Sequence, residues 1–205
     1  MNVDEAAVCR WLSRFYAREL DETTIAVYRS GGAAPIFAYL TKHQRLVSHV
    51  KRIERDIEAW SELSEPQLEL ACDFAGLFLG DGRTGALPYA SFYCGAEGRL
   101  FQAPHERMAT RLRAINLQVR EDLREPADHL AIMLEYLANR LEMGKVRPLI
   151  PTSEENCGHF VRTELLTWLP AFLKRANETA TATDLYKAVI SLTVDYLEGL
   201  VKRPG

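Results

Sequence analysis

The spacing of apolar residues constrains this chain more than any other feature of its sequence. A period of about 3.6 residues recurs in nearly every segment, whereas alternation of apolar and polar residues over four or more positions is hard to find. One clear example is the apolar stripe formed by Leu130, Met133, Leu134, Leu137 and Leu141. The pattern predicts an all-α fold.

Glycine and proline residues divide the helical pattern. Gly31-Gly32 predicts a helix stop, Pro35 is expected to open a helix, and Gly144 is expected just past the end of one. The predicted helices cover residues 3–20, 22–29, 35–60, 65–79, 104–121, 126–143, 153–176 (interrupted near Pro170) and 184–202. Residues 80–104 contain five Gly and two Pro and are predicted to form a long loop with aromatic side chains.

Pro126 marks a break between two groups of helices, because a residue that precedes proline is pushed away from the α region. The sequence predicts an N-terminal helical subdomain over residues 1–119, which includes the aromatic loop 80–104. A hinge over residues 120–128 and a C-terminal helical subdomain over residues 129–205 follow. Since each group presents an apolar stripe, we expect both a monomer and a homodimer that exchanges its C-terminal helices.

Charge and hydropathy exclude several classes of protein. The chain has 25 Lys and Arg against 28 Asp and Glu, a net charge of −3, which is the wrong sign for a nucleic-acid partner. No apolar run resembles a secretory signal or a membrane span, so we expect a cytoplasmic protein without stable membrane insertion. The cysteines form no CxxC pair, which favours reduced thiols at positions Cys9, Cys72, Cys94 and Cys157.

Two local patterns suggest chemistry but lack its context. Residues 80–85 match GxGxxG, but the dinucleotide fingerprint needs a strand before it and a helix directly after it, and neither is predicted here. Cys157 and His159 are too close in sequence to be two metal ligands on one helical face. We therefore expect no catalytic residue, no metal and no cofactor. A nucleotide-binding or nucleotide-hydrolysing helical enzyme stays open as an alternative.

The segment from Glu125 to His129 is the most informative one. Pro126 and Ala127 are expected to begin a helix, with Asp128 in its first turn, where the helix dipole stabilises a carboxylate. A protonated imidazole is disfavoured at that position, so His129 is expected to be either neutral and hydrogen-bonded or used at a surface. Composition alone favours the structural role.

Several blocks, in the same order, resemble one protein family. Residues 125–136, EPADHLAIMLEY, resemble the signature of the TorD/DmsD/NarJ family of redox-enzyme maturation chaperones. Residues 73–79, DFAGLFL, and 88–93, PYASFY, resemble a second block of that family, and residues 166–172 and 184–189 resemble its C-terminal helices. The departures are Phe74, where tyrosine is usual, and Leu185, where an aromatic residue is usual.

The resemblance implies an all-helical, non-catalytic cytoplasmic chaperone for a molybdoenzyme of the trimethylamine N-oxide reductase type. Such chaperones bind the client's twin-arginine leader and its apo form, keep it competent for molybdenum-cofactor insertion and delay its export. The client-handling positions correspond here to Pro88, Tyr89, Ser91, Tyr93, Glu125, Pro126, Asp128 and His129. Carboxylates such as Glu125 and Asp128 are expected to pair with the leader's arginines. A generic helical adaptor, with the EPADH segment only a helix cap, is the other alternative.

Overall fold

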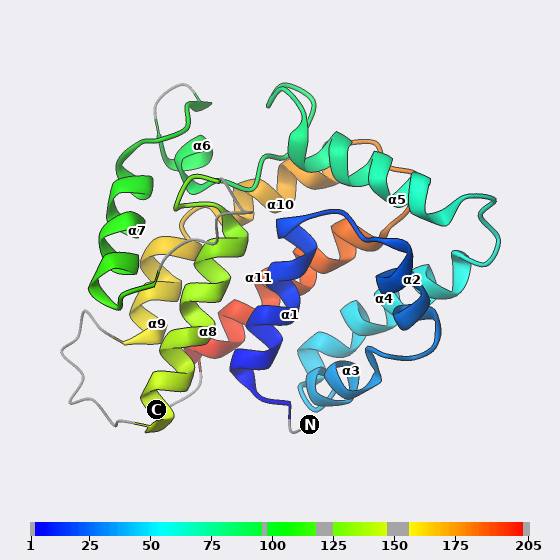
Figure 1. Cartoon of the computed structure of the whole chain (residues 1–205), viewed down its shortest axis with the longest axis horizontal. Coiled ribbons are helices and arrows are strands. Elements are labelled where there is room, and N and C mark those ends of the chain that lie inside the picture. The colour runs from blue at the N-terminus through cyan, green and yellow to red at the C-terminus, as the bar shows by residue number, and fades with distance from the viewer. Residues whose placement is uncertain (1–2, 96–97, 118–124, 147–155, 203–205) are drawn as a thin grey trace.

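The computed structural model describes residues 3–95, 98–117, 125–146 and 156–202, and within them the regular secondary structure is helical, as predicted. Helix α1 (Glu5–Ala17) lies at the centre of the molecule (Figure 1). It packs along α8 (Leu130–Val146) and also contacts the last helix, α11 (Leu185–Lys202). The first helix of the chain is therefore buried by helices from its second half.

The segment from residue 20 to residue 60 holds α2 (Glu22–Arg29), α3 (Ala34–Leu40), a 3₁₀ turn η1 (Gln44–Leu46) and α4 (Val47–Ala59). Gly31, at φ +83°, ends α2 in the left-handed conformation that glycine adopts without steric cost, which confirms the predicted stop. The single helix predicted over 35–60 was wrong. It is interrupted after Leu40, where the Thr41 hydroxyl donates to the Phe37 carbonyl and competes with helix continuation.

The middle of the chain contains more helix than predicted. Helix α5 (Pro66–Phe74) continues into a π-helical segment, η2 (Ala75–Leu79), so the helix predicted over 65–79 is confirmed. The segment 80–104, predicted to be loop throughout, contains the short helix α6 (Ala90–Cys94) and the start of α7 (Ala103–Ala114). The predicted end of that last helix, near residue 121, lies outside the described residues.

The C-terminal third consists of α9 (Cys157–Phe160), a π-helical segment η4 (Val161–Leu165), α10 (Leu169–Glu178) and α11. Pro170 lies in the first turn of α10, which confirms the predicted interruption. The role predicted for Gly144 was wrong, because α8 continues through it to Val146. An exposed glycine inside a helix costs only about 1 kcal/mol relative to alanine, which the packing of α8 against α1 offsets.

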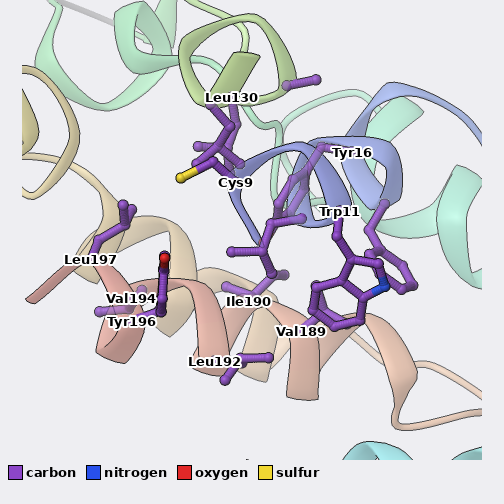
Figure 2. Close-up of a cluster of buried hydrophobic side chains, with 14 of the residues drawn as sticks. Cys9, Trp11, Tyr16, Leu130, Val189, Ile190, Leu192, Val194, Tyr196 and Leu197 are labelled. Atoms are coloured by element: carbon purple, nitrogen blue, oxygen red, sulfur yellow. The ribbon is translucent and has the colours of Figure 1, made fainter. Parts of the chain in front are cut away.

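Both groups of helices contribute to one hydrophobic core. Figure 2 shows Cys9, Trp11 and Tyr16 of α1 between α8 and α11. The Tyr16 hydroxyl lies 2.7 Å from the Thr193 hydroxyl of α11. Residues 120–124 of the predicted hinge lie outside the described residues, so the division into two subdomains stays a prediction.

Carboxylates from α4 and α5 hold the start of α11. The buried Asp73 carboxylate accepts hydrogen bonds from the N–H groups of Ala182 and Thr183 and from the Thr183 hydroxyl, each at 2.7 Å. Asp56 accepts from the Asp184 N–H at 2.7 Å, and burial raises the pKa of Asp56 above its usual range. Because bonds to a charged acceptor are stronger than neutral ones, this cluster fixes the last helix against the N-terminal half.

We predict that Asp73→Ala lowers the free energy of unfolding by about 2–4 kcal/mol, because two backbone N–H groups and the Thr183 hydroxyl lose a charged acceptor. Asp73→Asn, which keeps one carbonyl oxygen, should lower it less. Urea denaturation followed by circular dichroism measures both values. Glu58→Ala on the exposed face of α4 is the control and should stay within about 0.5 kcal/mol of the wild type. A loss for Asp73→Ala no larger than that of the control would contradict this account.

Candidate functional site

Two sequence blocks predicted to carry function lie against each other. Residues 88–90 pair with residues 128–130 as an isolated antiparallel bridge centred on Tyr89 and His129. The Leu130 N–H donates to the Pro88 carbonyl at 2.8 Å, and the Ala90 N–H donates to the Asp128 carbonyl at 3.2 Å. We call residues 88–93 together with 125–130 the junction. The backbone pairing explains how loop and hinge positions meet at one place.

Asp128 caps a helix, but not the helix that was predicted. Its Oδ2 accepts the N–H of Ser91 at 2.6 Å, in the first turn of α6. The Ser91 hydroxyl in turn accepts the N–H of Gln102, just before α7. Asp128 is fully buried, and its other oxygen, Oδ1, has no hydrogen-bond partner among the described residues. The carboxylate therefore stabilises a helix distant in sequence, which local reasoning could not find.

His129 immediately precedes α8. The helix starts at Leu130 rather than at Pro126, because residues 126–129 form a turn closed by the His129 N–H on the Pro126 carbonyl. The His129 Nδ1 accepts the Ala131 N–H at 3.2 Å, so the imidazole acts as an N-cap. Burial lowers the pKa of His129 to about 3. The expectation of a neutral, hydrogen-bonded histidine agrees with this geometry.

Tyr89 and Glu125 close the outer side of the junction. The Tyr89 hydroxyl donates to Glu125 Oε2 at 2.6 Å, and its ring meets the His129 ring edge-on at 4.9 Å. Burial, followed by the hydrogen bond to Glu125, raises the pKa of Tyr89 above its usual value. The hydroxyl therefore stays protonated and donates to the carboxylate.

His105, on α7, belongs to the site, although no local pattern of residues selects it. Its Nδ1 accepts the Ala127 N–H at 3.0 Å and lies 3.9 Å from Asp128 Oδ1. The exposed ring of Phe101 meets the His105 ring at 5.0 Å. Helix α7 is thereby attached to the hinge side of the junction.

Helix α10, with Trp168 directly before it, contacts residues 82–93 of the segment 80–104. Tyr93 stacks on Trp168 with ring centroids 5.5 Å apart, and Arg175 lies over the Phe92 ring at 5.4 Å. The Arg175 guanidinium also donates to the carbonyls of Gly82 and Gly85. Gly82 has φ +65°, and a Cβ there would lie 2.8 Å from the Phe92 ring. The glycines of the GxGxxG match thus have a packing explanation.

Burial determines whether the eight residues predicted to handle the client can contact a partner. Tyr93 and Glu125 are half-buried, while the other six are buried: Pro88, Tyr89, Ser91, Pro126, Asp128 and His129. In this conformation the Asp128 carboxylate is not exposed to an arginine from outside. Most of the junction therefore holds segments together rather than forming an open surface.

Metal-binding clusters and membrane-spanning helices are two further features that bear on function. No group of three or more His, Cys, Asp or Glu side chains there is arranged to hold a metal ion. None of the helices in these ranges has the length and apolar character that crossing a membrane requires.

The helical fold of the described residues is compatible with several classes of protein, and comparison with known proteins identifies the class. The model of a family described as "Nitrate reductase delta subunit" matches residues 43–174. The "Chaperone protein TorD" of Vibrio cholerae serotype O1 is 35% identical over 204 residues, which cover 97% of this chain and 90% of that protein. The protein of the same name from Vibrio vulnificus is 35% identical over 209 residues, covering 97% and 96%.

The chain belongs to the TorD/NarJ family of redox-enzyme maturation chaperones. The family is non-enzymatic, so the chain is a chaperone rather than an enzyme. The family-level resemblance drawn from the junction blocks is confirmed by matches that extend over nearly the whole chain.

The low pKa of His129 gives a stability prediction. The unfolded imidazole has a pKa near 6.5 and the folded one about 3, so the unfolded state binds a proton first as the pH falls. The stability present above pH 6.5 is therefore lost on acidification, by about 2 kcal/mol between pH 7 and pH 5. His129→Asn keeps a capping side chain that does not titrate. The difference in the free energy of unfolding between wild type and variant should therefore shrink by about 2 kcal/mol from pH 7 to pH 5.

Urea denaturation of both proteins across this pH range measures the effect. His159→Asn, which removes a half-buried imidazole elsewhere, is the matched control for the loss of one histidine. Parallel stability curves for wild type and His129→Asn would show that His129 does not titrate in this way.

Proposed function

We propose that this chain is a client-specific cytoplasmic chaperone for a molybdoenzyme of the trimethylamine N-oxide reductase type. It binds the client's twin-arginine leader and apo form, and keeps the client competent for molybdenum-cofactor insertion before export. The observation that carries the proposal is the near full-length match to proteins named TorD, together with the meeting of the two family-like blocks at one junction.

The junction is the proposed client-handling region, through all eight predicted positions. Because six of them are buried, we propose that they act by setting the positions of exposed neighbours. Phe101, which is 63% exposed and packs on His105, and the half-buried Glu125 are two such neighbours. An apolar ring and a carboxylate suit a segment of the client that carries apolar and basic residues.

We also propose that the C-terminal helices can exchange between two chains. The contacts of α1 with α8 and of α4 with α11 join the two halves within one chain. The same contacts can form between chains if the hinge straightens, so a swapped dimer adds few new contacts. A monomer and a dimer of similar free energy, separated by a barrier close to that of unfolding, follow from this arrangement.

We predict saturable binding of a twin-arginine leader without chemical turnover. Titration calorimetry with the leader peptide of the source organism's trimethylamine N-oxide reductase measures the affinity. Replacing both leader arginines by Gln should weaken binding, because a neutral amide does not reproduce a charge-assisted bond to a carboxylate. The same peptide with its apolar residues in scrambled order is the control for non-specific adhesion. Equal affinity of the arginine and glutamine peptides would contradict the ion-pair part of the proposal.

We predict that Asp128→Asn and Asp128→Ala separate client handling from folding. Asn keeps an acceptor for the Ser91 N–H and should cost about 1 kcal/mol or less, whereas Ala leaves that N–H unsatisfied and should cost about 1–3 kcal/mol. Both losses are smaller than a typical unfolding free energy of about 5–15 kcal/mol, so both variants should fold.

Maturation of the reductase in cells that carry each variant is the functional measurement. If the junction handles the client, Asp128→Ala should impair maturation more strongly than the equally destabilised control Ser13→Ala, whose hydroxyl bonds the Ala131 carbonyl. Maturation losses that follow stability alone would assign Asp128 a purely structural role.

A further inference from the structure

A groove lies between α2 and α5, away from the junction residues. Its volume is about 530 Å³. Ile25, Leu68 and Ala71 are among the apolar residues that line it, and Glu22 and Glu65 are among the charged ones. Figure 1 shows α5 crossing the upper right of the molecule with α2 below it. The groove is thus lined by both apolar and polar side chains, and two of the polar ones are carboxylates.

An apolar stripe extends the groove along α5 and η2. Five exposed residues recur at intervals of about one helical turn on the side opposite the buried Leu70, Phe74 and Leu77, namely Leu68, Cys72, Ala75, Gly76 and Leu79. Leu68 is 56% exposed and Leu79 is 66% exposed. One exposed leucine needs no explanation, but a continuous apolar row of about 16 Å is the kind of surface that a partner covers.

The segments that lead into α2 and α5 are strongly acidic. Residues 18–22 and 58–69 together carry seven carboxylates and a single arginine, and Arg29 is the other cation at the groove. Among the described residues, no ion pair engages Glu22 or Glu65. Two carboxylates outside any ion pair, which outnumber the one cation of the groove, complement a segment with two arginines and an apolar stretch, and disfavour an acidic helix or a second copy of the same acidic face.

We propose that the twin-arginine leader docks here, with its arginines paired to Glu22 and Glu65 and its apolar stretch along Leu68 to Leu79. The proposal rests on the leader-binding function proposed above and assigns that function a surface. The stripe ends at Leu79, where the segment 80–85 begins, and the Ala86 N–H bonds the Leu77 carbonyl at 2.7 Å. A leader docked on the stripe therefore leads toward the junction, which is left for the rest of the client.

The test uses the leader peptide of the source organism's trimethylamine N-oxide reductase, a fluorescent label on it, and the full-length chaperone. The double variant Glu22→Gln/Glu65→Gln should bind roughly tenfold more weakly at low salt, the loss expected from two partly exposed ion pairs. The peptide with both arginines changed to Gln should then lose little further affinity, because the two changes remove the same contacts. Leu68→Gln tests the stripe separately and should weaken binding roughly threefold to tenfold.

Glu54→Gln/Glu106→Gln is the matched control, since it changes the net charge equally at two exposed positions away from the groove. Thermal melts confirm that each variant is folded. Binding by the groove variants equal to that of the control would overturn the groove assignment and leave leader binding intact. Absence of binding by the wild type would overturn both the groove and the leader-binding function.

Discussion

The pairing of residues 88–90 with 128–130 is the contact on which the rest of this structure depends. It places Asp128 over the first turn of α6 and leaves His129 at the start of α8. Because α8 packs along α1, and α1 also contacts α11, the direction in which α8 leaves the junction determines how the two halves share one core. A short backbone pairing thus controls the placement of helices far from it.

The residue types at the junction follow from what each position must do. Asp128 supplies an acceptor without needing a donor, which suits a buried N–H at the start of α6. His129 must be neutral to accept the Ala131 N–H, and its burial keeps it neutral. Pro126 lies in a turn whose carbonyl bonds the His129 N–H, so the chain turns just before the helix. The segment 126–129 therefore caps two helices, α6 through Asp128 and α8 through His129.

The sequence predicted features set by local physics. The 3.6-residue period identified the helices, and Gly31 and Pro170 marked boundaries, because backbone sterics act within a few residues. The features that the sequence did not predict depend on contacts between residues far apart in the chain. Asp128 bonds to Ser91, His105 to Ala127, and Arg175 to Gly85. The prediction that a helix ends before Gly144 was wrong for a related reason, since the packing of α8 outweighs the weak preference of glycine for a helix end.

A chaperone of this kind must hold its own fold firmly while presenting a surface that a client can occupy and leave. The junction satisfies the first need, since its polar groups pair inside the protein, except Asp128 Oδ1 and the Tyr93 hydroxyl among the described residues, and its rings pack against α8 and α10. The α5 face satisfies the second, because apolar side chains and carboxylates there remain exposed at no cost to the core. Exposed ion pairs are weak and sensitive to salt, so a client held by them is released without unfolding the chaperone. Because the packed junction and the exposed α5 face are separate, the fold can be stable while binding is reversible.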